Sequence, residues 1–160
     1  MTGGMGDTLV RLEAFIAKWS QRLNADSASV TFAAQALDAP PGLHAATADR
    51  FVTALGYQPI GGNWELLDPD AAPDGARSAR AALIEAFSHN MVLSQQAWLG
   101  EADALAMAEG FLGCFDARTC QIVTNRMYFG WNPITSASIE WAFVAFDDSA
   151  IALLLATAEG

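Results

Sequence analysis

Two apolar runs near the C-terminus constrain the fold of this chain more than any other stretch. Residues 138–147 and 150–157 are rich in aromatic and branched aliphatic residues, and a short polar segment around Asp148 connects them. This pattern predicts two β-strands that pair as an antiparallel hairpin. Both faces of the first strand are apolar, with Ile139, Trp141, Phe143 and Ala145 on one side and Ala142, Val144 and Phe146 on the other. We therefore expect other elements to cover the sheet on both sides, or one sheet face to serve in association.

Two further segments are expected to join this sheet. Residues 120–129 mix β-branched and aromatic residues, and residues 63–67 form a shorter run of similar character. Apolar residues spaced by three and four predict helices over residues 8–23, 47–55, 79–87 and 105–115. Asp74 is the expected N-cap of the third of these helices. Residues 29–37 and 88–99 fit either a strand or a helix.

Length and loop pattern together indicate one domain. A chain of 160 residues can bury a substantial core, and the polar, proline-containing loop at residues 68–75 separates two parts that are each small. We predict a disordered tail at residues 1–6 and a single α+β domain over residues 7–160. Its C-terminal antiparallel sheet is expected to have three to four strands, packed with four or five helices.

The charge balance restricts the classes of partner. The net charge is −10, the sequence pI is about 4.3, and the eight basic residues are scattered, so we expect no nucleic-acid ligand. No apolar run approaches the roughly 18 residues of a membrane span, and the N-terminus lacks a secretory signal pattern. We expect a cytoplasmic protein without membrane contact. Its preference for alanine and arginine is typical of GC-rich bacterial genomes.

The strongest candidate for a recognition patch lies at the start of the predicted hairpin. It comprises Asn125, Arg126, Tyr128, Trp131, Asn132 and Glu140. A guanidinium in a β-rich segment is costly to bury without a carboxylate, so Glu140 is the expected cross-strand partner of Arg126. Arginine and tryptophan are also the residue types that dominate protein interfaces. The segment is therefore either a recognition patch or a salt bridge over which Trp131 packs.

Nucleophilic catalysis has weak support in this sequence. Cys114 and Cys120 are the only cysteines, and His44 and His89 are the only histidines. No cysteine is close to a histidine in the sequence. No G-x-S-x-G elbow is present. Both thiols are therefore expected to be core residues in a reducing compartment.

Metal and cofactor sites have no clear signature either. Glu85 and His89 are four residues apart on a predicted helix, a spacing that favours a hydrogen bond between them over a metal site. The acidic loop with Asp68, Asp70 and Asp74 lacks the glycine and the final glutamate of a calcium loop, so we interpret it as a solvated turn. No glycine-rich nucleotide motif occurs, and we expect neither a metal nor a cofactor.

These observations favour a non-enzymatic function. We expect a small acidic module that binds another protein, as a regulator, an inhibitor or an immunity-type factor. The expected partner is a basic protein or a second copy of this chain. The alternative is a small-molecule-binding protein or an enzyme, with a pocket between sheet and helices in which Arg126 anchors an anion.

Overall fold

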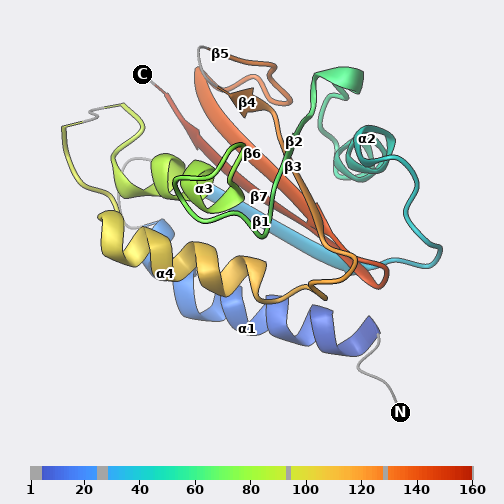
Figure 1. Ribbon diagram of the computed structural model, residues 1–160. Helices are drawn as coiled ribbons and strands as arrows, with labels where there is room; N and C mark the ends of the chain where they lie inside the picture. Colours follow the sequence, from blue (N-terminus) through green and yellow to red (C-terminus); the bar gives the residue numbers. More distant parts are fainter. Residues whose placement is uncertain (1–4, 25–28, 93–94, 128–129, 160) are drawn as a thin grey trace.

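A five-stranded antiparallel sheet runs through the centre of the molecule, and its strand order is β1-β7-β6-β3-β2 (Figure 1). The computed structural model describes residues 5–24, 29–92, 95–127 and 130–159. The helices are α1 (Met5–Leu23), α2 (His44–Ala54), the short 3-10 helix η1 (Gly61–Asn63), α3 (Ala79–Ser88) and α4 (Glu101–Leu112). The strands are β1 (Ser29–Ala36), β2 (Glu65–Leu67), β3 (Gln121–Thr124), β4 (Arg126–Met127), β5 (Gly130–Trp131), β6 (Ile139–Phe146) and β7 (Ala150–Ala158). The predicted α+β class is confirmed.

The predicted C-terminal hairpin forms the middle of the sheet. Strands β6 and β7 pair in antiparallel register from Ile139 opposite Ala158 to Phe146 opposite Ile151. Residues 29–37, which fit either strand or helix, contribute strand β1, whose residues pair along almost the whole length of β7. The alternation of β1 explains this outcome, because Val30, Phe32 and Ala34 pack on one side of the sheet.

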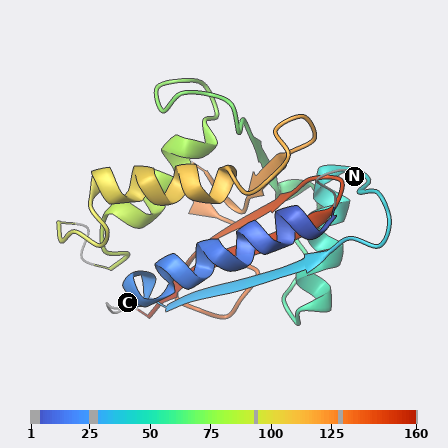
Figure 2. The same ribbon diagram turned by 90° about the horizontal axis from the view of Figure 1, so that it is seen from below.

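Helices from the same chain cover both faces of the sheet. Trp141 and Phe143 face a core shared with α1, α3 and α4, whereas Val144 and Phe146 face a second core shared with α2. Figures 1 and 2 show α1 and α4 lying across one face and α2 on the opposite side. Each fully buried phenylalanine or leucine contributes roughly 1.5–3 kcal/mol. Intramolecular cover thus accounts for the two apolar faces, without association through either of them.

The predicted strand at residues 120–129 is divided: β3 ends at Thr124, and Arg126 and Met127 form the separate strand β4. Asn125 interrupts it, because its side-chain Oδ1 accepts the hydrogen bond from the Ala142 amide at 2.8 Å. A side-chain oxygen has replaced the strand's own carbonyl in the ladder. The chain then leaves the sheet and forms a separate two-stranded ribbon, in which Arg126 is opposite Trp131. Tyr128 lies outside the described residues.

Several helix boundaries, and the segment at residues 88–99, differ from the sequence prediction. The third helix is capped by Ser78, whose hydroxyl accepts from the Ala81 amide, and not by Asp74. The first helix begins at Met5, within the segment predicted as a tail. The described part of residues 88–99 contains a single bridge between His89 and Ala97 in place of a regular element. Within the described residues, no helix combines the length and the apolar character that crossing a membrane demands.

Candidate functional site

Glu140 is buried and forms the centre of a hydrogen-bonded cluster below the recognition patch. Its carboxylate accepts from Asn125 Nδ2 at 2.7 Å, the Ile134 amide at 2.8 Å, the Thr135 amide at 3.0 Å and the Thr135 hydroxyl at 2.6 Å. These four donors satisfy the carboxylate and hold the 132–137 loop against the strands. The predicted ion pair between Glu140 and Arg126 is wrong, because the loop and Asn125 occupy both carboxylate oxygens.

Asn125 and Asn132 belong to the same interior cluster. The Asn132 amide donates to the Asn125 carbonyl at 2.9 Å, and Asn125 Nδ2 also donates to the Asn132 carbonyl at 3.0 Å. Asn125 is almost completely buried, so its side chain has no surface to offer to a partner. The structure therefore brings Asn125, Asn132 and Glu140 together as a positioning device for the loop.

Arg126 lies outside this cluster, with its guanidinium between two indole rings. Its Cζ is 5.1 Å from the ring centroid of Trp131, which is its pairing partner in the ribbon, and 4.6 Å from that of Trp141. The indole of Trp141 is fixed by a hydrogen bond from Nε1 to the Thr124 hydroxyl at 3.0 Å. Two cation–π contacts thus set the direction of the guanidinium.

No carboxylate within the described residues pairs with Arg126, and no hydrogen bond to its guanidinium is formed there. The side chain is nevertheless half-buried. Burial lowers the pKa of this guanidinium, and the nearby charge of Glu85 opposes that shift only in part. Arg80, the other partly buried arginine that borders a hollow, is paired with Glu109 at 2.6 Å. The desolvation cost of Arg126 is therefore offset by two indoles and by the nearby charge of Glu85, and within the described residues by no hydrogen bond or ion pair.

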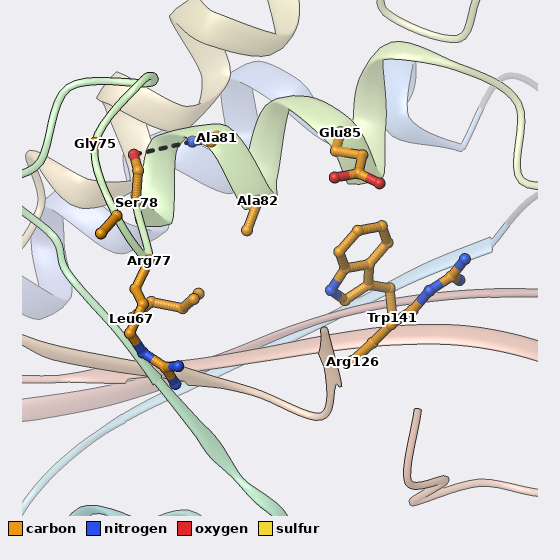
Figure 3. A pocket seen from close by; sticks show the side chains of 10 residues that line it. Leu67, Gly75, Arg77, Ser78, Ala81, Ala82, Glu85, Arg126 and Trp141 are labelled. Atoms are coloured by element: carbon orange, nitrogen blue, oxygen red, sulfur yellow. Dashed lines mark hydrogen bonds between the residues drawn. The ribbon is translucent and has the colours of Figure 1, made fainter. Parts of the chain in front are cut away.

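A cavity of about 440 Å³ opens beside this arginine, between α3 and the sheet. Its floor is formed by Leu67 and Trp141, its roof by α3, and one end by the turn at residues 75–78. Figure 3 shows Glu85 reaching down from α3 toward the indole of Trp141, with Arg126 beside that ring. The small side chains of Ala81 and Ala82 leave space between this face of α3 and the sheet. The volume lies within the range of small-molecule sites.

The second arginine at this cavity, Arg77, is already engaged. It adopts a left-handed backbone with φ 54°, which costs a non-glycine residue about 1 kcal/mol or more. Its carbonyl accepts from the Asp68 amide at 2.7 Å, its Nε donates to the Leu66 carbonyl at 2.7 Å, and it pairs with Glu65 at 3.0 Å. Figure 3 shows its guanidinium directed away from α3. Arg77 therefore ties the loop to β2.

Two residues of this site, Glu85 and Trp141, were not part of the predicted recognition patch. Trp141 was assigned to the core because it alternates with Phe143, and it does stack on Phe143 with ring centroids 5.9 Å apart. Glu85 was paired with His89, but α3 ends at Ser88 and His89 is extended, so the helical spacing does not apply. The sequence did contain a signal for this site. One face of the third helix carries two alanines and a glutamate, whereas a face that packs in a core usually carries large apolar residues.

The thiols do not provide a nucleophile in this arrangement. Burial raises the pKa of Cys114 to about 11 despite the nearby Arg11, and burial together with acidic neighbours raises that of Cys120 to about 12. Both are therefore protonated at neutral pH. Cys114 packs on the α1/α4 side of the sheet, whereas His44 begins α2 on the other side. Across the described ranges, no group of three His, Cys, Asp or Glu residues is arranged to hold a metal ion.

The cavity beside Arg126 is the feature of the molecule from which a function can be proposed. Comparisons of the chain with protein families, with curated proteins and with solved structures gave no match.

Proposed function

We propose that this protein is a non-enzymatic binding protein that holds the anionic group of a small molecule at Arg126. One observation carries the proposal: a half-buried guanidinium at the wall of a cavity has no anionic partner in the described part of the chain. A carboxylate supplied by a ligand would accept two parallel N–H bonds and compensate the desolvated charge. The cavity beside it supplies room for the rest of the ligand.

The surroundings of Arg126 favour a carboxylate over a phosphate. Glu85 lies on the same cavity and its charge acts on Arg126, so a doubly charged group would be repelled more strongly than a singly charged one. The two indoles hold the guanidinium in one orientation before a ligand arrives. Preorganisation of this kind reduces the entropy lost on binding.

The remaining cavity lining supports a binding role. Leu67, Ala81 and Ala82 provide apolar contact, and the hydroxyl of Ser78 is occupied by the Ala71 carbonyl at 3.2 Å and the Ala81 amide at 3.2 Å. A hydroxyl engaged in capping a helix is poorly placed to attack a substrate. The lining is thus suited to holding a molecule.

A thermal-unfolding series tests the proposal. Acetate, butyrate, hexanoate and benzoate, each compared with its neutral amide, should raise the Tm of the wild-type protein, most for the acids that fill the cavity. Arg126→Met should lose this effect. Arg50→Met, at an exposed arginine of α2 on the opposite side of the sheet, is the matched control and should retain it. Equal shifts for acids and amides, or for wild type and Arg126→Met, would contradict the proposal.

A protein partner is the second candidate function, and the position of Trp131 favours it. Trp131 is partly exposed on the ribbon and lines a shallow hollow with Pro133 and residues 135–137. Arginine and tryptophan side by side are typical of interface hot spots, and the net charge of −10 favours a basic partner. A second copy of the chain is the other partner to test.

The two candidates respond differently to Trp131→Ala. A protein interface centred on the ribbon requires that this substitution abolish capture of a defined basic partner while carboxylate binding persists. Val10→Ala, at a side chain of α1 that is 61% exposed, is the control. Sedimentation equilibrium at micromolar concentration tests self-association. A monomer under all conditions would contradict the idea that the partner is a second copy of the chain.

A further inference from the structure

Glu85 is an exposed acid that shares the cavity with Arg126. It lies on the face of α3 that also carries Ala81 and Ala82, one turn earlier. Within the described residues it has no hydrogen-bond or ion-pair partner. Figure 3 shows its carboxylate above the indole of Trp141, on the cavity side of the helix. The cavity therefore presents one free negative and one free positive group.

These two groups do not neutralise each other. Arg126 and Glu85 are farther apart than an ion pair, although the charge of Glu85 still acts on the guanidinium. A purely anionic ligand would satisfy Arg126 and be repelled by Glu85. A ligand that carries an ammonium as well as a carboxylate would satisfy both groups, because each charge would meet its opposite.

The other end of the cavity offers apolar surface and small residues, beside Arg77 and Ser78, whose polar groups are engaged within the chain. Leu67 forms its floor, and Gly75, Ala81 and Ala82 border it without filling it. An apolar side chain that leaves water for this space gains roughly 25 cal/mol per Å² of buried surface. The cavity thus combines one end that has free charges of both signs with another end where Leu67 and the alanines offer apolar contact.

We infer that the ligand is a zwitterionic α-amino acid with an apolar side chain, bound with its carboxylate at Arg126, its ammonium at Glu85 and its side chain toward Leu67. This inference rests on the proposed function, because it names the ligand class of the same cavity. Its new element is the role of Glu85 as the residue that selects a positively charged amino group.

Titration calorimetry with L-leucine and L-phenylalanine tests the inference. Each is compared with its N-acetyl derivative, which lacks the ammonium, and with its amide, which lacks the carboxylate. For the wild type, the free amino acid should bind at least about tenfold more tightly than either derivative. Glu85→Gln should reduce the preference over the N-acetyl form to less than about threefold, and Arg126→Met should abolish binding of the free acid.

Glu13→Gln, at an exposed acid of α1, is the matched control and should leave every affinity unchanged. N-acetyl amino acids that bind as tightly as the free ones, with both lost in Arg126→Met, would overturn the zwitterion inference and leave the carboxylate proposal intact. If no carboxylate of any kind binds, both fall. An unchanged preference in Glu85→Gln would show that another group selects the ammonium, and would overturn the assignment to Glu85.

Discussion

The turn of the β6–β7 hairpin and the β4–β5 ribbon beside Trp141 of β6 carry charged side chains in contrasting surroundings. At the turn, the buried carboxylate of Asp147 accepts from the Thr8 hydroxyl at 2.9 Å, the Asp116 amide at 2.9 Å, the Ser149 amide and hydroxyl at 2.8 Å and 2.9 Å, and the Ala150 amide at 3.0 Å. On the ribbon, Arg126 lies against two indoles and has no hydrogen-bond or ion-pair partner within the described residues.

The difference separates a charge that serves the fold from a charge that is free for a ligand. Asp147 connects α1, the segment after α4 and the hairpin turn, so its negative charge stabilises contacts between distant parts of the chain. Glu140 does the same for the 132–137 loop. Arg126 forms no hydrogen bond or ion pair of this kind with the part of the chain that the structure describes. Fully satisfied charges are expected to be costly to remove and an unsatisfied one to be nearly neutral.

The largest expected effect is that of Asp147→Ala. The substitution leaves several buried donors without an acceptor, so the free energy of unfolding should fall by about 3–4 kcal/mol in urea titrations. Asp148→Ala, at the exposed neighbour in the same turn, is the control and should change it by less than about 0.5 kcal/mol. If both substitutions lower the free energy of unfolding equally, the hydrogen bonds of Asp147 do not have the structural role assigned to them.

Glu140→Gln should have the next largest effect, about 2–3 kcal/mol. The amide group would place N–H donors against donors of the loop or of Asn125, where the carboxylate now accepts four hydrogen bonds. Limited proteolysis should then cleave the 132–137 loop faster. Glu159→Gln provides the control, because that acid is exposed and, among the described residues, bonds only Ser138. A fully stable Glu140→Gln variant would show that the carboxylate is not needed to hold the loop.

The pH dependence of stability should follow Asp147. Burial alone would raise its pKa, but hydrogen bonds from Asp116, Ser149 and Thr8 outweigh burial and lower the pKa below its ordinary value. A carboxyl whose pKa is lower in the folded state contributes stability above its unfolded pKa of about 4, and this contribution is lost as the pH falls through the folded value. Asp147→Asn should therefore show a shallower loss of stability with acid. If the free energy of unfolding of Asp147→Asn falls with acid as steeply as that of the wild type, this assignment is wrong.

The sequence predicted the hairpin because its signal is local: two apolar runs of the right length and a short polar connection between them. The pairing of Arg126 with Glu140 was wrong because Asn125 leaves the ladder through its side chain, and no periodicity reports such an exchange. The cavity depends on the approach of α3 to Trp141, two segments that are far apart in the chain. Arg126 was nonetheless predicted as a site residue from the cost of burying an arginine in a β-rich segment, and Trp131 from the frequency of tryptophan at interfaces.

The most direct test of the central claim is the free energy of unfolding of Arg126→Met in the absence of any ligand. Methionine replaces the aliphatic stem of the arginine, and it removes the guanidinium with its charge and its two cation–π contacts to Trp131 and Trp141. If the charge is held for a ligand, urea titrations should show a change of less than about 1 kcal/mol in either direction. A loss of more than about 2 kcal/mol would show that the charge serves the fold, as Asp147 does, and would contradict the account.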